Sequence, residues 1–158
     1  MTIQVLPKIP ESLVHRNKFA VEINGFDLAL FQKAKLPEVE FNEVTFSPAG
    51  SAFDQKVAGR AKYADVTLEK GVLQSGADQG ALNWIQTILE VNTGLGVMPP
   101  AYIRDVDIVL YSDLGVETRR FTLHGAWLKK LEYGEADGSS DENIVEIITI
   151  CYQYFTAQ

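Results

Sequence analysis

Histidine and cysteine are the side chains best suited to acid–base or nucleophilic chemistry near neutral pH, and this sequence holds only His15, His124 and Cys151. His124 lies in FTLHGAWLKK, three residues before Trp127, where apolar and polar residues alternate as in a β-strand. No Gly-x-Ser-x-Gly elbow accompanies it. Cys151 lies in the most apolar segment, where a thiolate is poorly stabilised. We therefore expect His124 and Cys151 to be structural residues.

Metal and phosphate sites are also incomplete. Two widely spaced histidines and one cysteine cannot supply a structural zinc site. The segment DGSSDE begins like a calcium-binding loop at Asp137, Ser139 and Asp141, but Glu142 stands where an EF-hand requires glycine. The segment GLGVMP leads into Pro99-Pro100 instead of into a helix N-terminus that binds phosphate. We expect no metal and no other cofactor.

Two carboxylate pairs are the last candidates for catalysis. They are Glu38 with Glu40 and Asp105 with Asp107, and each pair occupies the polar side of a predicted strand. Such a pair performs acid–base chemistry only where burial raises one of the two pKa values. A solvated strand face does not bury them, so the sequence predicts a protein that is not an enzyme.

Composition predicts one soluble globular domain. The 158 residues are 46% hydrophobic and 22% charged, and no stretch approaches the ~20 apolar residues of a membrane helix. The net charge of −7 disfavours tight nucleic-acid binding, which requires clustered Lys and Arg. The first residues lack the apolar core of a secretory signal. A single cysteine suits a reducing compartment, so we expect a cytoplasmic protein without a membrane anchor.

One segment has helical periodicity. In DQGALNWIQTILEVNTG, Ala81, Ile85 and Ile88 share a face, Asp78 can cap the start and Gly94 can end the helix. Most of the remaining chain alternates as strands do. The strand segments are 18–32 (a hairpin across Asn24-Gly25), 35–46, 61–72, 101–112, 117–133 and 143–155. About seven strands and one helix predict an antiparallel β-sandwich or barrel with an attached α-helix.

Three segments suggest how this domain is organised. Residues 1–17 contain Pro7 and Pro10 and predict an N-terminal arm, followed by a single β domain over 18–158. Residues 47–60 are rich in Gly and polar residues and predict a long loop, a kind that is usually functional. Residues 143–155 are apolar on both faces, so one face should meet the core and the other a helix or a neighbouring subunit.

The order of these segments resembles the tail tube proteins of contractile phages and of related contractile injection systems, over about residues 18–156. The positions that carry the resemblance are Phe19, Val21 and Ile23; Thr67, Leu68, Gly71 and Val72; Trp84; and Ala126, Trp127 and Lys129. Two positions depart from the family pattern: Leu128 replaces a frequent proline, and FQKAKLPEVEF replaces a Gly- and Ser-rich approach to the third strand.

The resemblance implies a tail-tube-like protomer that forms a homo-hexameric ring, with rings stacked into the inner tube of a contractile tail. The implied partners are a surrounding sheath protein, baseplate and tail-terminator proteins, and DNA or effector proteins that pass through the lumen without tight binding. The implied location is a virion tail or an injection-system tube, assembled in the bacterial cytoplasm. Such a function needs no active site.

Two groups of residues are expected to serve this assembly. For contact between adjacent rings, the predicted residues are Gly50, Phe53, Lys56, Gly59 and Arg60. For an acidic lumen wall that repels phosphates, the predicted residues are Glu38, Glu40, Asp65 and Glu69.

The sequence is also compatible with other functions. One is a monomeric ligand-binding or enzymatic β-barrel with His124 and the paired aspartates in its mouth. Others keep the architecture and change the context, to a tube-end or baseplate protein or to the tube of a type VI secretion machine.

Overall fold

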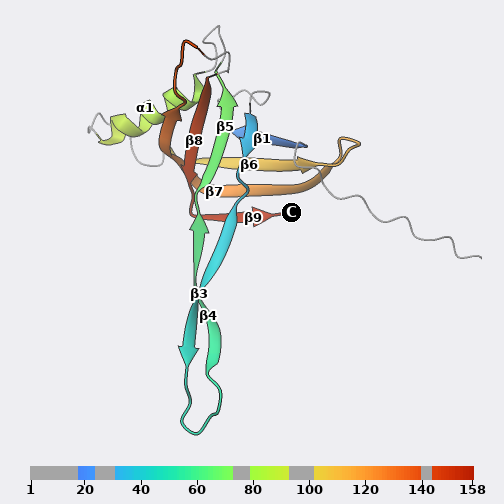
Figure 1. The fold of residues 1–158 in the computed structure, drawn as a ribbon, viewed down its shortest axis with the longest axis vertical. Coiled ribbons are helices and arrows are strands. Elements are labelled where there is room, and N and C mark those ends of the chain that lie inside the picture. Colours follow the sequence, from blue (N-terminus) through green and yellow to red (C-terminus); the bar gives the residue numbers. More distant parts are fainter. Residues whose placement is uncertain (1–17, 24–30, 73–78, 93–101, 140–143) are drawn as a thin grey trace, which may run out of the picture.

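A computed structural model describes residues 18–23, 31–72, 79–92, 102–139 and 144–158 (Figure 1). These residues form one helix and nine strands, and every strand pair is antiparallel. The elements are β1 (Phe19–Ile23), β2 (Phe31–Ala34), β3 (Glu38–Phe46), β4 (Gln55–Ala64), β5 (Val66–Gly71), α1 (Gly80–Asn92), β6 (Arg104–Tyr111), β7 (Glu117–Tyr133), β8 (Val145–Cys151) and β9 (Tyr154–Ala157). The predicted fold class, mainly β with one attached helix, is confirmed. The predicted arm 1–17 lies outside the described residues.

Two sheets share the long strand β7. The β6 sheet consists of β1, β6, β9 and the first half of β7, and the β8 sheet consists of β2, β5, β8 and the second half of β7. In Figure 1 the strands of one sheet run across those of the other, as in orthogonal β packing. The core lies between the sheets, where Val21, Ile108 and Leu123 from the β6 sheet meet Leu68 and Ile148 from the β8 sheet.

Gly125 marks the corner at which β7 passes from one sheet to the other. Its φ is 64°, a left-handed conformation that favours glycine. Arg104 pairs with Ala126 while Val106 pairs with Leu123, so β7 carries one extra residue here, a β-bulge. Leu123 and Ala126 are therefore both buried. Unbroken strand alternation from FTLHGAWLKK would place His124 on one face with Ala126 and Leu128, and this expectation is wrong, because the bulge exchanges the two faces of the strand.

Helix α1 packs through Trp84, which is fully buried. The indole Nε1–H of Trp84 donates a hydrogen bond of 2.6 Å to the backbone carbonyl of Tyr102. The guanidinium of Arg104 lies 5.0 Å from the centroid of its ring, a cation–π distance. The predicted helix is confirmed over 80–92, and its expected cap Asp78 and stop Gly94 lie outside the described residues. Among the residues described, no helix is long and apolar enough to cross a membrane.

The expected hairpin over residues 18–32 is wrong. Strand β1 pairs with β6, and β2 pairs with β5 in the other sheet. The residues around Asn24-Gly25 lie outside the described ranges. The last predicted strand is divided: β8 ends at Cys151, and β9 begins at Tyr154 in the β6 sheet. The chain thus turns the same corner twice, at Gly125 and after Cys151.

Candidate interaction surface: the projecting hairpin

The candidate functional site is the hairpin of β3 and β4, which forms its own two-stranded sheet and projects from the body of the molecule (Figure 1). All nine residues of β3 are exposed. In the sequence, Val39 and Phe41 alternate with Glu38, Glu40 and Asn42, a pattern that predicts one dry face for this strand. That expectation is wrong for this protomer. Residues 55–60, expected in a long loop, belong to β4. Because neither face of β4 packs on a core over residues 55–60, this part of the sequence lacks the apolar alternation of a half-buried strand.

Large apolar side chains are unusually exposed on this hairpin. Phe41 and Phe46 keep more than half of their surface accessible, at 57% and 59%, and Phe53 is 81% exposed. The complete set is Val39, Phe41, Val44, Phe46, Phe53 and Val57. Exposed apolar side chains gathered on one projecting element mark an interaction site on a folded protein.

The hairpin is anchored where it leaves the body. The rings of Tyr63 and Tyr152 lie edge to face with centroids 5.9 Å apart, and Tyr63 contacts Phe155 in the same way at 5.7 Å. The hydroxyl of Tyr152 donates to the backbone carbonyl of Glu38 at 3.5 Å. The direction in which the hairpin projects is thus set by aromatic packing at its root.

The apolar side chains change face halfway along the hairpin. Near the root, Val39 and Phe41 lie on one side of β3, and by strand alternation Val44 and Phe46 lie on the other. A register shift between these two groups gives β4 one extra residue near Gly59. A Cβ on Gly59 would lie 2.9 Å from the carbonyl oxygen of Asn42, so glycine permits the close approach of the strands. The hairpin therefore presents apolar surface on opposite sides at its root and at its outer half.

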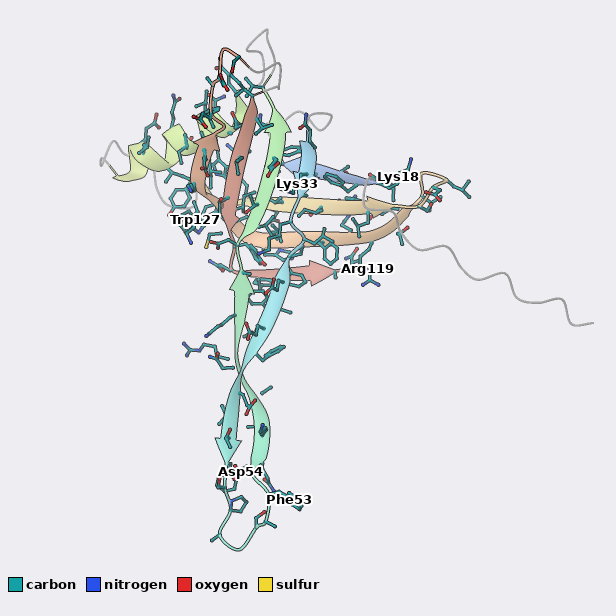
Figure 2. The ribbon with its side chains drawn as sticks, in the orientation of Figure 1. Lys18, Lys33, Phe53, Asp54, Arg119 and Trp127 are labelled. Carbon is teal, nitrogen blue, oxygen red and sulfur yellow. The ribbon has the colours of Figure 1, made fainter. Side chains whose placement is uncertain are left out.

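The turn at the far end is held by its own hydrogen bonds. Ser47 Oγ donates to Asp54 Oδ1 at 2.5 Å, and Ser51 Oγ donates to the carbonyl of Phe53 at 2.8 Å. Gly50 adopts a φ of 78°, which suits glycine. Figure 2 shows Phe53 and Asp54 at this end, far from the body. The turn thus presents Phe53 to solvent in a defined position.

The five residues predicted to contact an adjacent ring all lie on this hairpin. Gly50 and Phe53 are in the turn, and Lys56, Gly59 and Arg60 are on β4. Lys56 pairs with Glu43 across the strands at 3.4 Å, and both side chains are largely exposed. The structure thus brings the five together, and the apolar side chains of β3 extend the surface that they define.

The four residues predicted to line a lumen lie on two different surfaces. Glu38 and Glu40 are exposed near the root of β3, whereas Asp65 and Glu69 lie on the body. Asp65 pairs with Lys129 at 2.8 Å, and Glu69 pairs with Lys33 at 3.7 Å. Since these lysines neutralise them, Asp65 and Glu69 add little net charge to their surface.

A second charged surface is the outer face of the β6 sheet, of which the sequence indicated only Asp105 and Asp107. The guanidinium of Arg120 contacts Glu22 at 2.8 Å, Asp107 at 2.7 Å and Glu117 at 2.8 Å. The hydrogen bonds that Arg120 donates, first to Glu117 and then to Glu22, raise the pKa of Arg120. One cation against three carboxylates leaves this face acidic. In the sequence, this face was indicated only by the polar residues that alternate with apolar ones in β6. The strand order β1-β6-β7 is what brings Glu22 and Arg120 together.

His124 does not lie in the mouth of a barrel. Its ring stacks on Tyr154 with centroids 4.6 Å apart, and its Nε2 lies 3.0 Å from Thr156 Oγ1. Its Nδ1 lies 3.9 Å from Asp105 Oδ1. Within the described part of the chain, no three His, Cys, Asp or Glu side chains are placed to hold a metal ion. His124 therefore lies on the polar face of the β6 sheet.

Comparison with protein families gives one match over most of the chain. The model described as "T4-like virus tail tube protein gp19" matches residues 15–156. A comparison with curated protein sequences finds no match.

Solved structures share the fold at low sequence identity. A chain in the anti-feeding prophage cap, described as a tube terminating cap, matches with a TM-score of 0.80 and 21% identity, covering 100% of this chain and 99% of that one. A chain in the sheath-tube complex of an extracellular contractile injection system, PVC, matches with a TM-score of 0.76 and 20% identity, covering 94% and 93%. Hcp1 from Flavobacterium johnsoniae matches with a TM-score of 0.52 and 11% identity, covering 89% and 94%.

Proposed function

The chain belongs to the T4-like virus tail tube protein family, and from this premise we propose that it forms hexameric rings that stack into the inner tube of a contractile tail or injection system. Members of this family are structural proteins, and the chain is not an enzyme. The observation that carries the stacking proposal is the projecting hairpin with its exposed apolar side chains.

An isolated two-stranded hairpin is marginally stable in water. Here the hairpin exposes Phe41, Phe46 and Phe53 to solvent, each by more than half of its surface. Burial of the exposed part of each side chain contributes roughly 1–2 kcal/mol. A second ring provides an apolar partner for every hairpin of the first, so a stacking contact repeated six times per ring would be strongly stabilising.

The change of face along the hairpin supports contacts with two neighbouring copies. A flat partner surface covers one side of a ribbon, and Val39 with Phe41 lies on the opposite side from Val44 with Phe46. The proposed arrangement therefore inserts each hairpin between two subunits. The root face contacts one of them, and the outer half contacts the other.

Strand edges support the closure of a ring. In the part of the chain that the structure describes, β1 and β9 form the two edges of the β6 sheet. Exposed edges invite pairing with another chain, and a closed ring removes them by pairing the β9 edge of one copy with the β1 edge of the next. Such a ring would join six four-stranded sheets into one continuous barrel.

The proposed channel wall is acidic, so that a polyanionic cargo passes without adhering. Glu38, Glu40, Asp65 and Glu69 are the first candidates for it. Of these, Glu38 and Glu40 would contribute most of the net charge, since lysines pair with the other two.

The polar face of the β6 sheet is a second candidate wall. It carries a net negative charge around Arg120. As a channel wall, it would line the inside of the barrel that forms when the β9 and β1 edges pair. The cargo in this proposal is DNA or an effector protein that passes without tight binding.

The remaining proposed partners follow from the family and from its structural neighbours. A sheath protein would surround the tube, and a baseplate and a terminator would bind its two ends. The particle would be a phage tail or an injection-system tube, assembled in the bacterial cytoplasm. A tube-end role is the alternative, and it predicts rings that do not stack.

The stacking proposal is tested by replacing Val44, Phe46 and Val57 together with threonine, which keeps the β propensity of the hairpin and removes its outer apolar surface. We expect the purified variant to form rings in negative-stain electron micrographs, and to form tubes at much lower yield than the natural protein. Sedimentation of the same samples measures the fraction in tubes.

The matched control exchanges Glu43 and Lys56, which preserves their ion pair at the same level of the hairpin. This control should form tubes normally. Tubes of normal yield from the threonine variant would contradict the stacking role. Rings of the natural protein that never stack at any concentration would favour the tube-end alternative.

The channel proposal has its own test. Glu38 and Glu40 are replaced together with lysine in one variant, and Asp105 is replaced with lysine in another. The substitution that lies on the wall should leave assembly intact and cause the tubes to retain added DNA at low salt. A substitution that abolishes rings or tubes would place its residues in a subunit contact instead.

A further inference from the structure

A buried ion pair joins two strands on the core side of the β8 sheet. Lys70 and Glu146 are 2% and 5% exposed, and their charged groups lie 3.3 Å apart. They face each other directly across β5 and β8, and Tyr133 lies opposite Glu146 on β7. Burial and a hydrogen bond to Glu146 raise the pKa of Tyr133 to about 12. A row of Lys70, Glu146 and Tyr133 therefore crosses three strands at one level.

The apolar residues of these strands do not define the alignment of β5 with β8. Val66 and Leu68 face Ile150 and Ile148 on the core side. If β5 slid by two residues, each side chain would keep its face, and Leu68 would meet Ile150 instead of Ile148. Since all four residues are branched and apolar, the slid alignment would bury a similar surface.

The ion pair distinguishes the two alignments. After this slide, Lys70 would lie opposite Ile148, and Glu146 would lie opposite Val72. Moving two charges apart inside a protein is strongly unfavourable, because each loses its partner while remaining away from water. A buried polar pair that selects one register is a use for which such pairs are known.

The alignment of β5 also determines how far the hairpin reaches. Strand β4 ends at Ala64 and β5 begins at Val66, so the two form a nearly continuous ribbon. On the other side of the ribbon, the amide of Lys35 donates to the carbonyl of Thr67 at 2.8 Å, which ties the link between β2 and β3 to β5. A slide of two residues would therefore move the whole hairpin by about 7 Å along the strand direction.

We propose that the Lys70–Glu146 pair selects the register of β5 against β8 and thereby sets the reach of the β3–β4 hairpin. The effect on ring spacing rests on the proposed stacking function. The effect on register does not, because it belongs to the single protomer.

The register is measured by trapping with the natural cysteine at position 151. One row beyond the pair Val66 and Ile150, residue 65 lies opposite Cys151 in the native alignment. Asp65→Cys therefore forms a disulfide with Cys151 in the native register, and Thr67→Cys does so only after a slide of two residues. Each reporter is placed in the full chain, with the natural ion pair and with the apolar variant Lys70→Met/Glu146→Leu.

With the natural pair, we expect Asp65→Cys to cross-link nearly completely under mild oxidation and Thr67→Cys to remain reduced. In the apolar variant, we expect the Thr67→Cys cross-link to rise at least fivefold. The matched control is Lys33→Met/Glu69→Leu, which removes a more exposed ion pair that joins β5 to β2. This control should retain the native pattern.

The idea is overturned if the apolar variant cross-links only through Asp65→Cys. If the apolar variant does not fold, the exchanged pair Lys70→Glu/Glu146→Lys decides the question. It should fold in the native register under the proposal, and a misfolded or slid product would contradict it. Since trapping is performed on dilute protomers, a failed stacking function would leave this result unaffected.

Discussion

Gly125 lies directly against Gln153: a Cβ built on Gly125 would come within 2.9 Å of Gln153 Cδ. The backbone N–H of Gln153 also donates to the carbonyl of His124 at 2.9 Å. These contacts join the two places where the chain passes between the sheets. The corner of the fold therefore depends on the absence of a side chain at position 125.

Replacing Gly125 with alanine should lower the free energy of unfolding by about 2 kcal/mol or more. About 1–2 kcal/mol comes from the left-handed backbone conformation, and the contact with Gln153 adds a steric cost. Urea unfolding followed by tryptophan fluorescence measures the change. Adding Gln153→Ala should recover the steric part alone.

Gly138→Ala serves as the control for the first prediction, because a Cβ there meets no atom within 4 Å. It should change stability by no more than about 0.5 kcal/mol. A Gly125→Ala variant as stable as the natural protein would show that the corner tolerates a side chain.

Replacing Arg120 with glutamine should destabilise the protomer by about 1 kcal/mol at pH 7, because Glu22, Asp107 and Glu117 then face one another without a cation. The hydrogen bond from Arg120 lowers the pKa of Glu117 below its ordinary value. A lowered folded-state pKa stabilises the protein above the unfolded value, and this contribution is lost as the pH falls through the folded value. The difference between the two proteins should therefore shrink below about pH 4.

Denaturant unfolding at pH 7 and pH 3.5 tests whether the difference in stability shrinks at low pH. The matched control is Arg119→Gln, one position away on the exposed part of β7, and it should show a smaller effect at both pH values. A difference for Arg120 that stays constant down to pH 3 would argue against carboxylate pairing as its cause.

Cys151 should react slowly with a thiol reagent in the folded protein. Burial raises the pKa of its thiol, the charge of Asp65 raises it further, and Lys129 opposes the shift. At pH 8, Asp65→Asn should therefore increase the rate by roughly threefold, and Lys129→Met should decrease it. Stopped-flow absorbance with an aromatic disulfide reagent measures the rate.

The same chains unfolded in urea provide the reference for Cys151, since all three should then react at one common rate. If Asp65→Asn reacts no faster than the natural protein while folded, the charge of Asp65 does not act on the thiol.

Local patterns predicted most of the regular elements. The helix around Trp84 and the strands of the body were found because each has a buried face that repeats at the period of its own structure. The same rule fails for β4, where it predicts a loop over residues 55–60. This part of the hairpin packs on no core, and its sequence carries no such repeat.

Pairing between distant segments could not be predicted. The Asn24-Gly25 turn signal suggested that the strands on its two sides pair with each other, but β1 pairs with β6. Strand alternation assigned the residues of β7 after His124 to the wrong faces, because one extra residue at Gly125 exchanges the two faces. A glycine within a strand was the only signal of that bulge.

The sequence by itself determined the fold class, the lack of an assembled catalytic motif and the family resemblance, because these depend on residue types and on their order along the chain. The tertiary structure decided which charges are paired, which face of each strand is buried, and that residues 38–64 project as a hairpin. Lys70 and Glu146 show the reason: their contact joins strands 76 positions apart, and the energy of such a contact depends on burial, which no local pattern contains.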